Sequence, residues 1–476
     1  MGSTVRTRCG VRLRVRVRKL VRRGGRGTAA TSRSAALGGL AALGALVALT
    51  ACGPLSGDDG AAATDTPVQV AKAPAQRPIP QGDGSKVADD FNGDGHRDLV
   101  LGDLVKDQLH TDDAGIGIVY GSPGGLVPGA RQLLSPARQA ARTKGQLPAV
   151  FDAEATCDLD GDGFTDLVVS TDPPYDGQGQ PPVPLQLLFG SPDGLTGRAV
   201  TLVIPAQARA GNDWPDQPVC GDFDGDGAQD LVVHASDVQL SYLRGPFTRK
   251  GAPKKAGAPI AAPGNVPTGP AADVNHDGYD DLVVRTADGT SKSALVLGGP
   301  DGPTRTGTVL PEGVDVALGR FGKGRDLDAA VGGGGPPARA KPSVGEGETS
   351  LRYDLPAATS GTLASPGSML DTGDFDGDGR DELVSSGSRL RVFRAPTAAS
   401  GLSAAGMVTV APPTHGTTRV LTVGDFDGDG RDDLVVRTYR GETWDEVAVY
   451  PGVKTSHKTG LVAAKPSVTF SSAEFL

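Results

Sequence analysis

The sequence has few aromatic residues and few cysteines, with 12 Phe, 7 Tyr, 2 Trp and 4 Cys among 476 residues. It also lacks the long uninterrupted helical patterns of a helical bundle, which excludes an all-helical fold. In their place it has 70 Gly and 37 Pro, which interrupt regular structure every few residues and favour many short strands joined by turns. With 38% hydrophobic residues the chain is too apolar for wholesale disorder, so we expect a folded, all-β body.

Acidic residues are missing from the start of the chain. Residues 1–51 contain eleven of the 47 Lys and Arg residues and no Asp or Glu. The rest of the chain therefore holds 36 basic against 56 acidic side chains, a net charge of −20. Nucleic-acid phosphates would be repelled by this charge, so we expect no nucleic-acid partner, and the balance favours cations or neutral ligands.

An apolar run at residues 35–49 follows the basic start, and its length suits a signal peptide rather than a full membrane span. The run leads into the sequence LTAC, which ends at Cys52 and resembles the lipobox of bacterial lipoproteins. This resemblance implies that residues 1–51 are a signal peptide, that Cys52 carries lipid, and that the protein is anchored on the outer side of the bacterial cytoplasmic membrane. The alternative is an ordinary cleaved signal with an unrelated cysteine. Residues 52–86, rich in Gly, Pro, Ala and Asp, predict a flexible, disordered tether.

An Asp-rich pattern recurs along the rest of the chain, as in DLDGDGFTDLVV. The six intact copies begin at Asp90, Asp158, Asp222, Asp273, Asp374 and Asp425. A decayed copy, GRFGKGRDLDAAV from Gly319, makes seven units. The units begin about 50 to 70 residues apart, which matches a four-stranded propeller blade better than an ankyrin or tetratricopeptide repeat.

Each unit can be read as four strands. The residues before the Asp loop predict strand A, and the Leu-Val-Val that follows it predicts strand B. Strand C is predicted at residues 116–120, 184–189, 294–297 and 446–450, and strand D at residues 131–134, 199–203 and 467–470. The closure of the ring stays open at this point, because residues 467–470 could end the last blade alone or residues near Ser85 could complete it.

The repeats resemble FG-GAP repeats, also called VCBS-type repeats, which form the propeller of integrin alpha subunits and occur in many bacterial surface proteins. The resemblance covers residues 87–476 and implies a seven-bladed β-propeller. It implies ligand or carbohydrate binding, but the family also includes propellers attached to hydrolases and lyases or acting as such enzymes. Fold alone does not decide between these functions.

The Asp loops have the chemistry of calcium sites. Counted from the first Asp, oxygen side chains fall at positions 1, 3, 5 and 9, and a Gly at position 6 lets the carbonyl of position 7 face an ion. An EF-hand is excluded because position 12 is apolar, as at Val169 and Val233. The alternative is a set of solvated acidic turns without metal. The copy near Gly319 lacks the acids, with Lys323 at position 5, so we expect six structural Ca²⁺ sites.

The expected ligands share positions 1, 3, 5 and 9 of each loop. They are Asp90, Asn92, Asp94 and Asp98; Asp158, Asp160, Asp162 and Asp166; Asp222, Asp224, Asp226 and Asp230; Asp273, Asn275, Asp277 and Asp281; Asp374, Asp376, Asp378 and Glu382; and Asp425, Asp427, Asp429 and Asp433.

Two further sets of residues stand out. The first is aromatic and belongs to connections on the face opposite the Asp loops: Tyr175, Trp214, Tyr439 and Trp444. Flat rings beside acids and amides suit a sugar or protein ligand, whereas the alternative is local packing of long loops. The second set is Cys157 and Cys220, at the ends of strand A in adjacent blades. They predict a disulfide in an exported protein, or else two buried thiols.

No catalytic motif is evident. The sequence shows no Ser-His-Asp order, zinc-ligand spacing, phosphate-binding loop or nucleotide fingerprint, so an enzyme is possible but unsupported. We expect a monomeric, lipid-anchored, Ca²⁺-stabilised binding or adhesion module at the cell surface, for carbohydrate or protein. The alternatives are a polysaccharide-active hydrolase or lyase, which would need a carboxylate pair or a His–acid pair opposite the calcium face, and a structural envelope protein.

Overall fold

The computed structural model describes residues 3–6, 12–15, 75–105, 113–175, 177, 182–269, 271–322, 324–334, 348–364, 367, 369–395, 401–440, 445–454 and 460–475. One compact unit holds residues 1–16 and 73–476, and the other, residues 17–72, lies outside the described residues together with Cys52 and the apolar run. Strands β1 (Ser3–Arg6) and β2 (Arg12–Val15) pair only with each other in the described part of the chain. Within the same part, no helix is both long and apolar enough to cross a membrane.

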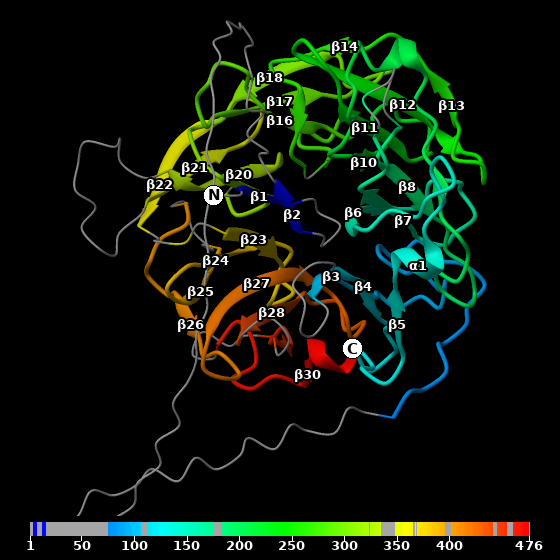
Figure 1. Ribbon diagram of the computed structural model, residues 1–476. Coiled ribbons are helices and arrows are strands. Elements are labelled where there is room, and N and C mark those ends of the chain that lie inside the picture. Colours follow the sequence, from blue (N-terminus) through cyan, green and yellow to red (C-terminus); the bar gives the residue numbers. More distant parts are fainter. Residues whose placement is uncertain are drawn as a thin grey trace, which may run out of the picture. The chain divides into compact units, whose positions relative to one another are not determined.

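The strands from β3 onward form seven antiparallel sheets that follow one another around a ring, so this part of the chain is a seven-bladed β-propeller (Figure 1). Blade 1 consists of β3 (Leu99–Val105), β4 (Asp113–Val119) and β5 (Arg131–Leu134). Blade 2 consists of β6 (Phe151–Cys157), β7 (Asp166–Thr171), β8 (Leu185–Leu188) and β9 (Val200–Thr201). Blade 3 consists of β10 (Val219–Gly221), β11 (Asp230–His234), β12 (Gln239–Phe247), β13 (Pro253–Ala256) and β14 (Ile260–Ala261).

The remaining four blades have four strands each. Blade 4 consists of β15 (Val266–Pro267), β16 (Leu282–Arg285), β17 (Ser293–Leu297) and β18 (Arg305–Val309). Blade 5 consists of β19 (Asp315–Gly319), β20 (Asp328–Gly334), β21 (Glu348–Tyr353) and β22 (Thr359–Ala364). Blade 6 consists of β23 (Met369–Gly373), β24 (Glu382–Ser386), β25 (Leu390–Phe393) and β26 (Val408–Val410). Blade 7 consists of β27 (Thr417–Gly424), β28 (Asp433–Tyr439), β29 (Glu446–Tyr450) and β30 (Val468–Ser471).

Helical structure is confined to short turns. The described chain has α1 (Pro136–Gln139) between blades 1 and 2, η1 (Ala206–Ala208) between blades 2 and 3, and η2 (Ser472–Phe475) after β30. The expected all-β fold is therefore confirmed.

The second strand of each blade is apolar on both faces because each blade packs between two neighbours. In β7 and β28 nearly every residue is buried, whichever face it points to. The buried residues fall into seven clusters, one at each interface between adjacent blades. Position 2 of each loop contributes a side chain to the interface with the next blade, as Phe223 does between blades 3 and 4 and Phe426 between blades 7 and 1.

The ring closes without a shared strand. Strand β30 pairs with β29 and completes blade 7, whereas blade 1 has no strand on the inner side of β3 among the described residues. Side chains join the two blades instead: Arg97 Nη1 donates to the carbonyl of Val423 at 3.2 Å, and Arg437 Nη1 donates to the carbonyl of Gly102 at 2.9 Å. Arg97 also lies over the ring of Phe426, at 5.3 Å from its centre.

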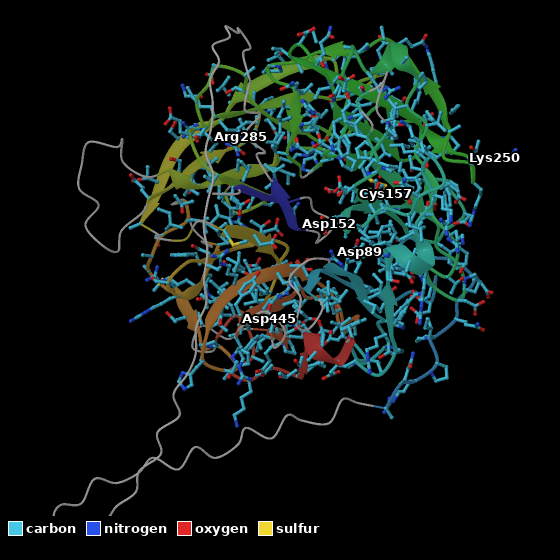
Figure 2. The ribbon with its side chains drawn as sticks, viewed as in Figure 1. Asp89, Asp152, Cys157, Lys250, Arg285 and Asp445 are labelled. Carbon is cyan, nitrogen blue, oxygen red and sulfur yellow. A yellow bond between two sulfur atoms is a disulfide. The ribbon has the colours of Figure 1, made fainter. Side chains whose placement is uncertain are left out.

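A disulfide joins the inner strands of blades 2 and 3. It links Cys157, at the end of β6, to Cys220 in β10, with 6.4 Å between their Cα atoms. Figure 2 shows the position of Cys157 in the ring. The bond crosses an interface whose packing already includes both cysteines.

Candidate metal centre

The first carboxylate of each Asp loop holds the turn together. In all six loops its Oδ2 accepts the N–H of the glycine at position 6, at 2.7–3.0 Å. That glycine has a positive φ in every loop, for example 88° at Gly163 and 81° at Gly430, which a residue with a side chain rarely adopts. The glycine predicted from the motif is therefore required by the backbone.

The acid at position 9 is a buried clamp between three strands. Asp166, the first residue of β7, accepts the N–H of Leu159 and the N–H of Gly190, each at 2.9 Å, so it ties the loop to the residue that follows the third strand. Asp433 does the same in blade 7 with Phe426 and Gly452. Burial raises the pKa of Asp166 to about 8 and that of Asp433 to about 7, because removal from water disfavours the charged form.

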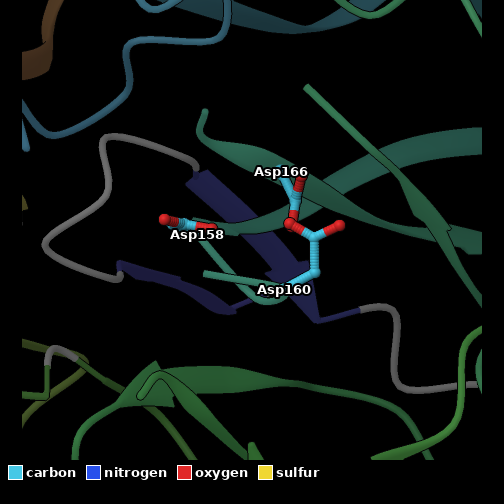
Figure 3. A group of neighbouring side chains, drawn as sticks. All are labelled: Asp158, Asp160 and Asp166. Carbon is cyan, nitrogen blue, oxygen red and sulfur yellow. The ribbon is translucent and has the colours of Figure 1, made fainter. Parts of the chain in front are cut away.

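Positions 1, 3 and 9 converge in four loops. In each of these loops three acidic side chains offer oxygen atoms that all lie within 4.8 Å of one another. The four groups are Asp158, Asp160 and Asp166; Asp222, Asp224 and Asp230; Asp374, Asp376 and Glu382; and Asp425, Asp427 and Asp433. Figure 3 shows the group of blade 2, with Asp160 and Asp166 turned toward one another and Asp158 beside them.

The acid at position 5 also stabilises the turn. Its Oδ1 accepts the N–H of position 7 in all six loops, as Asp162 does from Phe164 at 3.1 Å and Asp94 from His96 at 3.0 Å. None of the position-5 acids belongs to the four converging groups. In these four loops the structure therefore groups positions 1, 3 and 9, and the ligand role of position 5 stays a prediction.

The converging oxygens fit a hard divalent cation. Asn92 Oδ1, Asp160 Oδ1 and Asp222 Oδ1 are buried and have no hydrogen-bond partner in the described chain, and all three belong to positions 1 or 3. Asn92 is completely buried, so its amide oxygen has no access to water. An unpaired buried oxygen is costly, and Ca²⁺ binds oxygen ligands of this kind. Positions 1, 3 and 9 would hold the ion, which would neutralise their charge.

Several arginines already contact these loops. Arg249 contacts Asp160 at 2.5 Å and also pairs with Asp162, and Arg394 contacts Asp376 at 2.7 Å. In blade 2 the guanidinium approaches Asp160 Oδ2 and leaves Oδ1 without a partner. An arginine on Asp160 Oδ2 is therefore compatible with an ion on Asp160 Oδ1.

The loop of blade 5 corrects one sequence assignment. The prediction placed Lys323 at position 5 and found no acid in this copy; Lys323 itself lies outside the described residues. In the structure Asp328 accepts the N–H of Phe321 and of Asp354, both at 2.8 Å, which is the pattern of position 9 in the other blades. The copy therefore starts one residue later, at Arg320, and keeps the position-9 acid. Phe at position 2 of four intact copies also favours this register, and the bond from Phe321 to Asp328 establishes it.

The described aromatic residues of the predicted ligand face lie in three different segments of the chain. Tyr175, between β7 and β8, is 57% exposed. Trp214, between η1 and β10, is half-buried, and its backbone N–H donates to Asn212 Oδ1 at 3.0 Å. Tyr439, at the end of β28, packs against Arg419 and Arg437 of its own blade. Trp444 lies outside the described residues.

A His–acid pair on this face does not have the form of a catalytic base. His234 Nδ1 lies 3.1 Å from Asp216 Oδ1, but Nε2 lies 3.0 Å from the amide nitrogen of Asn265. Asn212 adds a bond to the carbonyl of His234 at 2.8 Å. Both ring nitrogens are therefore engaged by neighbouring connections, and the pair ties blade 3 to the segments around it.

Comparison with known proteins supports the repeat. Residues 158–233 and 374–436 match the FG-GAP-like repeat, so the chain carries FG-GAP-like repeats. Similar solved structures include the Dos1 propeller, with 10% identity over 82% of this chain and 86% of that chain and a TM-score of 0.44. A second is BBS1N in complex with ARL6DN, soaked with lead, with 14% identity over 70% of this chain and 82% of that chain and a TM-score of 0.37. A third is the dihydro-heme d1 dehydrogenase NirN in complex with DHE, with 14% identity over 77% of each chain and a TM-score of 0.38. No curated protein matches the sequence.

Proposed function

We propose that this protein is an exported, Ca²⁺-stabilised propeller that is lipid-anchored through Cys52 on the outer side of the bacterial cytoplasmic membrane. We propose that it acts there as a monomeric binding or adhesion module for a carbohydrate or protein ligand. The observation that carries the calcium part is the convergence of positions 1, 3 and 9 within 4.8 Å, together with buried oxygens that lack partners.

A bound cation would stabilise its blade through the contacts already described. Positions 1 and 3 lie in the turn, and position 9 lies at the start of the second strand and also accepts an N–H from the residue after the third strand. An ion shared by these carboxylates would therefore link three strands of one blade. It would also remove the repulsion among three acids, which amounts to several kcal/mol at an effective dielectric constant near 20.

Chelation tests the proposal. With a dissociation constant of about 10⁻⁴ M, as in extracellular modules, Ca²⁺ at about 100 times that value stabilises by about 2.7 kcal/mol per site. For several sites, removal of Ca²⁺ from the full chain in detergent should lower the melting temperature by roughly 10 °C or more. Asp158→Ala should reduce this difference, whereas Asp301→Asn, in an exposed turn of blade 4, should leave it unchanged. Equal melting temperatures with Ca²⁺ and with chelator would disprove calcium stabilisation.

The ligand-binding part has its own test. Exposed Tyr175 and half-buried Trp214 flank blade 2 on the face opposite the Asp loops, which is the support for a recognition surface there. We expect binding in a screen of glycans and cell-wall fragments, reduced by Trp214→Ala and by Tyr175→Ala. The control is Tyr120→Phe, which alters a buried hydroxyl. Binding unaffected by both alanine variants would remove this face from consideration.

A further inference from the structure

The six Asp loops are not equivalent. We propose that in blade 3 the hydroxyl of Tyr242 and the guanidinium of Arg244 take the place of the Ca²⁺ ion at Asp224 and Asp230, so that this loop does not bind the metal although Asp222 Oδ1 stays without a partner. The inference rests on the proposed calcium function, because it concerns which loops take the ion.

Tyr242 joins the two acids that the other loops would share with an ion. Its hydroxyl lies 2.8 Å from Asp224 Oδ2, at position 3, and 2.7 Å from Asp230 Oδ2, at position 9. Arg244 forms an ion pair with the same Oδ2 of Asp224 and lies 3.8 Å from Asp226 Oδ2. A hydroxyl with one proton to donate therefore lies between positions 3 and 9, and a cation lies against positions 3 and 5.

The other oxygens of these two acids are also bonded. Asp224 Oδ1 accepts the N–H of Asp226 at 3.2 Å, and Asp230 Oδ1 accepts the N–H of Gly245 at 2.7 Å. Ca²⁺ needs six to eight oxygens at about 2.3–2.6 Å. To ligate Asp224 and Asp230 an ion would have to displace the Tyr242 hydroxyl and the Arg244 guanidinium together. Only Asp222 Oδ1 is left buried without a partner in this loop.

The position of Tyr242 in β12 explains why a hydroxyl meets the loop acids in blade 3 and not at the matching position of the other blades. Tyr242 lies three residues before Gly245, the donor to the position-9 acid, and its side chain packs at the interface with blade 4. The matching residues in the other blades are aliphatic and carry no hydroxyl: Ile118, Leu187, Leu295, Leu351, Val392 and Val449. Each of them packs in the corresponding interface cluster.

The tyrosine ring is held in this position by its neighbours. It meets Phe223 edge-on, with 6.4 Å between ring centres. It also passes close over Gly302, where a Cβ atom would lie 2.3 Å from Cε1 of the tyrosine. The hydroxyl is therefore directed at the loop before any ligand binds, which makes it an effective competitor for the carboxylates.

An arginine without the tyrosine is a different case. Arg394 of blade 6 occupies the same place as Arg244, one residue before the donor to the position-9 acid. It donates to Asp376, while Glu382 accepts the backbone N–H groups of Ala395 and Phe375. Since no hydroxyl joins positions 3 and 9 there, we expect blade 6 to take an ion. The expected number of Ca²⁺ ions is therefore five rather than six.

The test counts Ca²⁺ ions per chain by equilibrium dialysis with radioactive Ca²⁺, on the full chain in detergent. Asp158→Ala, at position 1 of blade 2, should lower the count by one. Asp222→Ala, the same change in blade 3, should leave it unchanged. Tyr242→Phe combined with Arg244→Gln should raise the count by one, and adding Asp222→Ala to that variant should cancel the gain. Tyr120→Phe, a buried tyrosine that bonds Gln132 instead of a loop, is the control.

Each outcome either supports or overturns the inference that blade 3 binds no Ca²⁺. The inference is overturned if Asp222→Ala lowers the count as Asp158→Ala does, or if the Tyr242 and Arg244 variant gains no ion. If that variant does not fold, the comparison of the two alanine variants is sufficient alone. Failure of the proposed function differs from both results, because the wild-type protein would then bind no Ca²⁺ at all and Asp158→Ala would change nothing.

Discussion

Arg97 should be the residue on which closure of the ring most depends. It bonds Asp89 through Nη2 at 2.8 Å and Nε at 3.1 Å, and it reaches across to Val423 of blade 7. Asp89 is almost fully buried, and burial raises its pKa while the charge of Arg97 lowers it. Figure 2 shows the position of Asp89. The pair is therefore a buried ion pair located at the seam between the first and last blades.

The expected cost follows from leaving a buried charge without its partner. Arg97→Met would keep most of the side-chain volume but leave the carboxylate of Asp89 with no cation. Removal of one partner of a buried pair costs about 3–5 kcal/mol. Adding Asp89→Asn to Arg97→Met removes that charge and should restore part of the loss, whereas independent sites would show additive losses.

The assay is urea unfolding of the full chain in detergent, at constant Ca²⁺. Arg138→Met, an exposed arginine of α1, is the matched control and should stay within about 0.5 kcal/mol of the wild type. Gly424→Ala gives an independent perturbation, because a Cβ there would lie 1.7 Å from Arg97 Nη1 and would displace the guanidinium. Gly257→Ala, where a Cβ meets nothing within 4 Å, is its control. A loss below about 1 kcal/mol for Arg97→Met would refute this account of the seam.

Three other outcomes are expected. The disulfide between Cys157 and Cys220 spans 63 residues, so reduction should lower the free energy of unfolding by about 4 kcal/mol, and a Cys157→Ser, Cys220→Ser variant should lose a similar amount and no longer respond to reductant. Burial raises the pKa of Asp328 to about 6 from 3.8, so the folded protein binds this proton more tightly than the unfolded chain does. The proton therefore adds about 3 kcal/mol to the free energy of unfolding below about pH 4, and this contribution is lost as the pH rises through 6. In chelator, the free energy of unfolding should fall between pH 4 and 7 by about 3 kcal/mol less for Asp328→Asn than for the wild type, because Asp166 and Asp433 titrate in both proteins. Phe475→Ala should cost about 3–5 kcal/mol in urea unfolding, because the ring is buried in the seam between blades 7 and 1, and Phe475→Leu should lose less in the same assay.

Much of the fold could be predicted from local sequence patterns, because each blade repeats the same short signals. The Leu-Val-Val runs mark the second strands, since a strand buried on both faces needs apolar residues throughout. The expected last strand at residues 467–470 agrees with β30 (Val468–Ser471) to within one residue. The glycines of the loops marked their turns because the positive φ there excludes most other residues.

The ring seam could not be predicted, because its contacts join residues far apart in sequence. Arg97 and Val423 are separated by 326 residues, and no local pattern distinguishes Arg97 from an exposed arginine. The role of Tyr242 was missed for a related reason. An aromatic residue in the third strand fits the hydrophobic pattern equally well whether or not its hydroxyl reaches a loop.

The position-9 clamp separates the architecture of a blade from cation binding. Asp328 makes the two backbone bonds of position 9 in blade 5, where positions 1, 3 and 5 carry Arg320, Gly322 and Gly324. The clamp therefore forms without any of the other loop acids. If the strands are held by the clamp and the interface clusters, an ion is needed only to relieve the repulsion among the acids that remain. Chelation should consequently lower the melting temperature while leaving the β-sheet circular dichroism of the folded protein unchanged, and loss of that signal at 25 °C would show instead that the blades need the ion to form.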